Sequence, residues 1–144
     1  MDNINFDNYM HLEFLNKSEN ESFARATVGA FVAQLDPTVS AITEIKTAVS
    51  EAVTNAVIYA YESKIDYIYI SCGIVGRDVY INVEDKGIGI PDIEQALEPA
   101  YTTKPESERA GMGFTIMQSF MDELTVESKT GVGTIVKMMK SIEE

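Results

Sequence analysis

The stretch Val83-Glu84-Asp85-Lys86-Gly87-Ile88-Gly89-Ile90-Pro91 ends a β-branched run and then places a carboxylate and two glycines at alternate positions. Two further Gly-x-Gly pairs lie downstream, at residues 111–113 and 131–133. Glycine reaches positive φ and lets the backbone approach a ligand closely. Upstream, Glu51 and Asn55 stand out as polar residues in an apolar segment with helical spacing. The three glycine loops and the polar helix face together predict a nucleotide site assembled from several loops.

The composition is that of one globular domain, with 144 residues, 45% of them hydrophobic and 24% charged. A formal net charge of −12 argues against nucleic acid or an anionic membrane as the main partner. The charge fits a basic protein partner or simply an acidic surface. No apolar run approaches the ~18 residues of a membrane span, and no signal-peptide pattern opens the chain. The single cysteine, Cys72, predicts a buried inert thiol and fits a cytoplasmic protein.

The first elements are predicted to be an edge strand over residues 6–15 and a helix that begins at a capping box. In that box, Ser18 and Glu21 would satisfy each other's backbone N–H groups. Helical spacing predicts that one apolar stripe faces the core, formed by Phe23, Thr27, Ala30 and Phe31. Asp36-Pro37 ends this helix, because the residue before a proline disfavours helical geometry.

A second helix is predicted from a cap at Thr38 or Ser40 to about Tyr61, apolar nearly all round in its second half and therefore buried. Glu51 and Asn55 lie four residues apart on one of its faces. A buried unpaired carboxylate is costly, so Glu51 needs a partner, a metal ion or an opening to a cleft. The spacing alone leaves open whether the pair is structural or functional.

The second half of the chain alternates hairpins with helices. Residues 65–74 and 78–84 form a predicted hairpin that delivers Asp85 to its end, and residues 92–98 form a short helix. The polar, proline-containing residues 99–110 predict a lid. A third helix opens at Gly111-Met112-Gly113, where free N–H groups favour a phosphate, and a last hairpin spans residues 124–139. The predicted fold is α+β, a mixed and mostly antiparallel sheet with helices on one face.

The order of the motifs is more specific than any single one. A Glu-x-x-x-Asn helix is followed by Asp-x-Gly-x-Gly after a strand, Gly-x-Gly opening a helix, and Thr-Gly-x-Gly-Thr before the last strand. This order resembles the Bergerat-type ATP-binding fold shared by gyrase B, the Hsp90 chaperones, histidine kinases and MutL. The stretches that extend the match are residues 21–25, 31–38, 50–56, 101–106 and 108–117. They resemble the family of sporulation anti-sigma factors F over nearly the whole chain.

The resemblance implies a dimeric serine protein kinase made of one ATP-binding domain, residues 1–144, with a lid at about residues 98–112. Such proteins bind ATP and Mg²⁺, hold sigma factor F away from RNA polymerase, and phosphorylate a serine of a small anti-anti-sigma protein. One alternative is a nucleotide-dependent sigma-binding module without kinase activity. A sensor histidine kinase is disfavoured, because His11 is the only histidine and no dimerisation helix carries it.

The resemblance also implies residue roles. Asp85 corresponds to the residue that accepts from the adenine amino group, Gly87 and Gly89 would let the backbone lie against the base, and Thr134 lies near adenine. Asn55 corresponds to the magnesium ligand.

Glu51 corresponds to the general base that takes the substrate hydroxyl proton. The expected nucleotide contacts are completed by Thr102, Thr103, Lys104, Gly111, Met112 and Gly113.

Arg109 corresponds to a lid arginine that serves catalysis and contacts both protein partners. Arg25 corresponds to a residue of the sigma-facing surface. Two positions depart from the pattern, since Tyr59 replaces a usual histidine and Ala100 a bulkier apolar residue.

Overall fold

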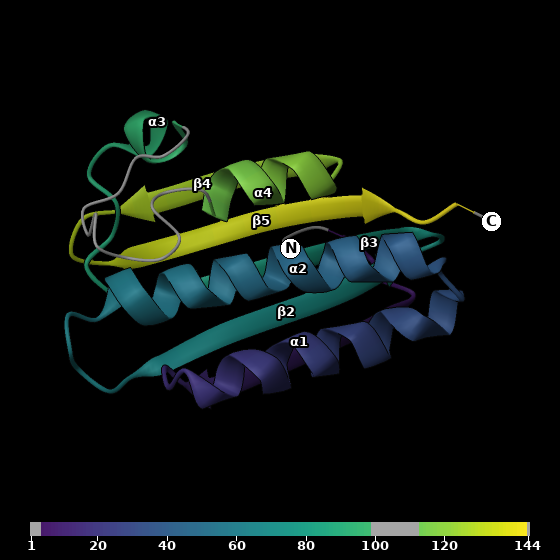
Figure 1. Cartoon of the computed structure of the whole chain (residues 1–144), viewed down its shortest axis with the longest axis horizontal. Coiled ribbons are helices and arrows are strands. Elements are labelled where there is room, and N and C mark those ends of the chain that lie inside the picture. Colours follow the sequence, from purple (N-terminus) through teal and green to yellow (C-terminus); the bar gives the residue numbers. More distant parts are fainter. Residues whose placement is uncertain (1–3, 99–112, 144) are drawn as a thin grey trace.

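The computed structural model describes residues 4–98 and 113–143, which form a sheet covered on one face by helices (Figure 1). The elements in chain order are β1 (Asn8–Leu15), α1 (Glu19–Val32), the 3-10 turn η1 (Ala33–Leu35), α2 (Val39–Asn55), the π-helical turn η2 (Ala56–Ala60), β2 (Tyr67–Val75), β3 (Asp78–Asp85), α3 (Ile93–Ala96), α4 (Gly113–Phe120), β4 (Glu123–Lys129) and β5 (Gly133–Ser141). No helix among the described residues is long and apolar enough to cross a membrane.

The five strands are ordered β1-β2-β3-β5-β4, and each neighbouring pair is antiparallel. Helices α1, α2 and α4 lie side by side over one face of this sheet, with α2 in the middle (Figure 1). The predicted α+β class, the predicted edge strand and both predicted hairpins are confirmed. The mixed character is not seen, because no described strand pair is parallel.

The period-two pattern explains which face of the sheet is covered. In β2, Ile68, Ile70 and Cys72 have no exposed surface and point toward the helices. They meet α2, whose Ile45 and Val49 are also completely buried. Burial raises the pKa of the Cys72 thiol to about 12, so the thiol stays protonated at neutral pH.

The predicted capping box at the start of α1 is wrong. Ser18 is itself in a helical conformation and makes no side-chain cap, because its hydroxyl donates to Glu19 Oε1 at 3.0 Å. Glu21 lies instead 3.5 Å from the Arg25 guanidinium.

The predicted apolar stripe of α1 is confirmed at Phe31, which packs against the core, but is wrong at Phe23 and Ala30, which are exposed. Phe23 is 53% exposed, whereas Ala24, Val28 and Val32 are fully buried. Two stripes with the same helical spacing compete in this sequence, and the one with smaller side chains faces the core. Close packing favours it, since a Cβ added at Gly29 would lie only 3.0 Å from Lys46 Cδ of α2.

Helix α2 begins and ends as predicted. Thr38 caps it by accepting from the Ala41 N–H at 3.1 Å. After Asn55 the helix widens into η2, which ends at Ala60, one residue before the predicted end. The Ala60 carbonyl then accepts from the Ile88 N–H at 2.8 Å. The end of α2 is thereby joined to the loop that follows β3.

Candidate functional site

A cavity of about 400 Å³ lies between the end of α2, the ends of β3 and β5, and the start of α4. Ligand pockets of small molecules are roughly 300–1,000 Å³ and mostly apolar with a few polar groups. The lining is mainly apolar, and its polar side chains are those of Asn55, Tyr59, Glu62, Asp85, Asp92, Gln95 and Thr134. The cavity therefore has the size and character of a site for a small organic ligand.

Asp85 and Thr134 form the polar part of the cavity where β3 meets β5. The two residues are directly paired across the strands, and each is 8% exposed. The Gly87 N–H donates to Asp85 Oδ1 at 3.0 Å. Burial raises the pKa of the Asp85 carboxyl, and the backbone N–H groups of Gly87 and Thr134 oppose that rise. Asp85 thus offers a strong hydrogen-bond acceptor to a mainly apolar cavity.

The glycines after Asp85 serve packing within the chain. A Cβ added at Gly87 would lie 2.0 Å from the Ala60 carbonyl oxygen. Gly89 has φ of +80°, and a Cβ there would lie 2.5 Å from the Lys129 carbonyl oxygen. Close packing against protein backbone is thus one reason for glycine at both positions. The expectation that both glycines let the backbone lie against a base stays a prediction. Gly89 still lines the cavity, whereas Gly87 does not.

Glu51 and Asn55 meet the N-terminus of α4. A Cβ added at Gly113 would lie 2.9 Å from Asn55 Nδ2 and 3.3 Å from Glu51 Oε2. Asn55 lines the cavity, and Glu51 is buried one turn earlier at 6% exposure. Because Gly113 has no side chain, the start of α4 packs closely against these two side chains. A helix N-terminus beside a carboxylate and an amide suits a phosphate group and its cation.

The remaining predicted site residues stand apart from this group. Six of them lie outside the described residues, namely Thr102, Thr103, Lys104, Arg109, Gly111 and Met112. Most of the predicted lid lies there too.

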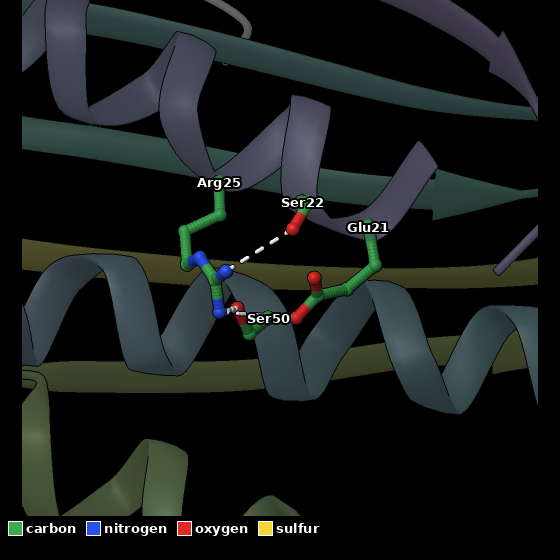
Figure 2. A network of polar contacts seen from close by, with 4 residues as sticks. All are labelled: Glu21, Ser22, Arg25 and Ser50. Atoms are coloured by element: carbon green, nitrogen blue, oxygen red, sulfur yellow. Dashed lines mark hydrogen bonds and ion pairs between the residues drawn. The ribbon is translucent and has the colours of Figure 1, made fainter. Parts of the chain in front are cut away.

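Arg25 lies at the contact of α1 with α2 and not at the cavity (Figure 2). Its guanidinium donates to Ser22 Oγ at 3.2 Å and to Ser50 Oγ at 3.4 Å, and it lies 3.5 Å from Glu21 Oε1. The Arg25 side chain is 41% exposed. The Arg25 side chain is therefore partly exposed and is also held in place by its three neighbours.

Nothing in the sequence indicated that Ser128 contacts the cavity-lining residue Thr134. The Ser128 Oγ accepts from the Ile90 N–H at 2.6 Å and lies 2.9 Å from Thr134 Oγ1. Ser128 faces Thr134 across the β4–β5 hairpin. Only the register of that hairpin could have revealed the contact, and the register depends on a turn whose type the sequence did not fix.

The fold and the cavity define a nucleotide-binding α+β domain, and comparison with known proteins agrees. Residues 14–140 match the family of histidine kinase-like ATPase domains. The anti-sigma F factor of Caldanaerobacter subterraneus subsp. tengcongensis is 58% identical over 139 residues, which cover 96% of this chain and 97% of the relative. The anti-sigma F factor of Bacillus velezensis is 54% identical over 138 residues, which cover 95% and 94%. The chain belongs to the anti-sigma F factor family of these ATPase domains.

A solved structure supports the fold alone. The RsbU and RsbW domains of Rv1364c from Mycobacterium tuberculosis superpose with a TM-score of 0.68 at 18% identity. The match covers 94% of this chain and 32% of that one.

Proposed function

We propose that this chain is an ATP-dependent anti-sigma factor that binds sigma factor F and a serine protein kinase that phosphorylates its anti-anti-sigma protein. The observation that carries the proposal is that Glu51 and Asn55 meet Gly113 at one end of the cavity while Asp85 and Thr134 lie at its sheet end. One cavity thus joins a hydrogen-bonding end suited to a base with an end suited to phosphates. The names of the relatives, anti-sigma F factor, support the sigma-binding part.

The base end binds adenine. Asp85 accepts from the adenine amino group, and the Thr134 hydroxyl lies beside it. Apolar side chains of the lining, among them Val83 and Val136, bury the rest of the ring. Since adenine is flat and apolar on both faces, burial supplies affinity and the two polar groups supply selectivity.

The phosphate end positions the triphosphate. The N-terminus of α4 at Gly113 donates backbone N–H groups to the phosphates. The Asn55 amide oxygen holds Mg²⁺, which neutralises phosphate charge when bound. By resemblance, the nucleotide contacts also include Gly111, Met112 and the lid residues Thr102, Thr103, Lys104 and Arg109.

Glu51 acts as the general base. Phosphoryl transfer depends mainly on positioning and charge stabilisation, and the attacking hydroxyl must lose its proton. Glu51 takes that proton from the serine of the substrate protein as the serine oxygen bonds to the γ-phosphorus and ADP leaves. Glu51 is 6% exposed, so its carboxylate is shielded from bulk water.

Arg25 contacts the sigma factor beside the contact of α1 with α2, away from the cavity. The Arg25 guanidinium donates to Ser50, and the next residue of α2 is Glu51, so the partner-facing and nucleotide-facing parts of α2 share one helical turn. The chain acts in the cytoplasm as a homodimer of single domains spanning residues 1–144. With a net charge of −12, it favours a sigma factor whose contact face is basic.

The proposal is tested by following labelled γ-phosphate from Mg-ATP to the anti-anti-sigma protein. Glu51→Gln keeps the shape of the side chain and removes the base, so transfer should fall ~10²-fold or more while ATP binding stays within about threefold. Glu123→Gln, an exposed residue of β4, is the matched control and should transfer normally.

Unchanged transfer by Glu51→Gln would refute the role of the base. No transfer by the wild type, with ATP and sigma factor both bound, would leave a nucleotide-dependent sigma-binding module without kinase activity.

A further inference from the structure

The hydroxyl of Tyr61, the residue after η2, lies where strand β3 leaves the sheet. Asp85, the last residue of β3, is paired with Ile68 of β2. The next pair in this register would join Lys86 to Tyr67, which is still a strand residue. The Tyr61 hydroxyl bridges these two residues instead, since it accepts from the Lys86 N–H at 2.7 Å and donates to the Tyr67 carbonyl at 2.5 Å. A side chain from outside the sheet thus ends the β2–β3 ladder at Asp85.

The hydrogen-bond roles of the Tyr61 hydroxyl are fixed by its neighbours. The Lys86 N–H can only donate and the Tyr67 carbonyl can only accept, so the hydroxyl accepts from the first and donates to the second. Tyr61 is 5% exposed. Burial raises the pKa of this hydroxyl to about 12, and the negative charge of Asp85 adds to the rise. The hydroxyl therefore keeps its proton at neutral pH, and both contacts are made at once.

The position of Lys86 decides how the Asp85 carboxylate is held. The next residue, Gly87, donates its N–H to Asp85 Oδ1 at 3.0 Å, so the turn over residues 85–87 folds back onto the carboxylate. Without the Tyr61 hydroxyl, the Lys86 N–H and the Tyr67 carbonyl would satisfy each other directly and lengthen the ladder by one pair. Gly87 would then move with Lys86, and the Asp85 carboxylate would lose an N–H that orients it.

A neighbouring contact confines this effect to the turn. The Ala60 carbonyl accepts from the Ile88 N–H at 2.8 Å, and this contact between backbone atoms does not involve the Tyr61 side chain. Ile88 lines the cavity, whereas Lys86 and Gly87 do not. The apolar wall formed by Ile88 would therefore stay in place while the carboxylate changes its orientation.

We propose that Tyr61 is a positioning residue for base recognition, which acts through Lys86 to hold the Asp85 carboxylate toward the amino group of adenine. Tyr61 does not line the cavity, so it acts without touching the nucleotide. This inference rests on the proposed function, in which Asp85 accepts from that amino group. Its consequence is that the Tyr61 hydroxyl contributes to selectivity between bases and little to the binding of the rest of the nucleotide.

The test compares ATP with purine riboside triphosphate, in which hydrogen replaces the 6-amino group, by calorimetric titration of the wild type and Tyr61→Phe. The substitution removes one oxygen and keeps the ring. A hydrogen bond to a charged group is stronger than one between neutral groups, so ATP affinity should fall about tenfold, or ~1.4 kcal/mol. The affinity for the analogue should fall at most about twofold, because it has no amino group to lose. Tyr9→Phe, the same change at an exposed residue of β1, should alter neither affinity.

A second readout needs no nucleotide. The Gly87 N–H lowers the pKa of the Asp85 carboxyl, so that pKa should be higher in Tyr61→Phe than in the wild type when the carboxyl carbon is followed by NMR. An unchanged pKa would overturn the inference. Equal losses of affinity for both nucleotides, or no loss of ATP affinity, would also overturn it and leave the proposed ATP site standing. A wild type that binds no ATP would instead overturn the proposed function together with it.

If Tyr61→Phe does not fold, hydrogen exchange of the wild type replaces it. Coupling between two contacts is reciprocal, so the amino group held by Asp85 should in turn strengthen the contact of Lys86 with Tyr61. The Lys86 amide should exchange about fivefold more slowly with ATP bound than with the analogue bound, both at saturation. Equal exchange in the two complexes would overturn the inference.

Discussion

The substitution Gly113→Ala separates the stability of the fold from the geometry of the site. The added methyl group would lie 2.9 Å from Asn55 Nδ2, 3.1 Å from Asn55 Oδ1 and 3.3 Å from Glu51 Oε2. These neighbours are ends of side chains, so they can move by a few tenths of an ångström. Gly113 has no positive φ, and alanine is therefore compatible with its backbone.

The two effects of Gly113→Ala differ in size. Alanine in place of glycine within a helix gains roughly 0.5–1 kcal/mol, which offsets most of the cost of moving Asn55 and Glu51. The free energy of unfolding should change by less than about 1 kcal/mol, or ~4 °C in the melting temperature. Catalysis is more sensitive, because a displacement of ~1 Å can cost ~10²-fold in rate, and a few tenths of an ångström would cost about 3- to 10-fold on the same scale. Phosphate transfer should therefore fall about 3- to 10-fold.

Thermal unfolding and phosphate transfer are measured on the same preparations of the wild type and of two variants. Gly29→Ala is the control, because its added Cβ would meet only the flexible stem of Lys46, at 3.0 Å, away from the cavity. It should transfer phosphate at the wild-type rate. If Gly113→Ala transferred phosphate at the wild-type rate, the placement of the phosphates against α4 would be refuted. If unfolding of the variant explained its loss of transfer, Gly113→Ala would no longer support this placement.

Asp85 and Arg25 give two further predictions. Without nucleotide, the free energy of unfolding should decline as the pH rises from 3.8 through the raised pKa of Asp85, because the folded state holds this proton more tightly. Urea unfolding at several pH values should show that Asp85→Asn removes this decline; an identical pH profile would contradict the buried carboxyl. Arg25→Ala should lower sigma-factor affinity at least tenfold yet change the free energy of unfolding by less than about 0.5 kcal/mol, since a surface ion pair stabilises little. Arg77→Ala should leave sigma-factor affinity unchanged and lower the free energy of unfolding by about 2–3 kcal/mol, because Arg77 donates to the carbonyls of Leu35, Ile142 and Glu143. A loss of sigma-factor binding by Arg77→Ala would argue against a local role for Arg25.

Local patterns predicted the parts of the fold that depend on nearby residues. The strand that delivers Asp85 was recognisable over residues 78–84 from its alternating β-branched residues, and the structure extends β3 by one residue, to Asp85. The i, i+4 spacing of Glu51 and Asn55 on a buried helix marked them as unusual, and both meet Gly113. Such features follow from the period of an element and need no knowledge of its partners.

Features that depend on distant contacts were not predictable. The outward position of Phe23 results from which of two equivalent stripes packs more closely on α2. The need for glycine at position 87 comes from the Ala60 carbonyl, which is 27 residues earlier in the chain. Ser128 meets Thr134 only through the register of β4 with β5. In each case the deciding partner is distant in sequence or set by a turn, and sequence periodicity carries no information about it.

The most direct measurement is a titration of the isotopically labelled protein with Mg-ATP, monitored by the backbone amide signals in NMR. The largest shifts should occur at Gly89, Gly113 and Thr134, which line the cavity from three separate segments. Tyr9 and Tyr69 lie on strand positions that alternate with the buried ones and so belong to the uncovered sheet face, and their signals should change little. Shifts concentrated at those tyrosines, with none at the cavity, would contradict the nucleotide site.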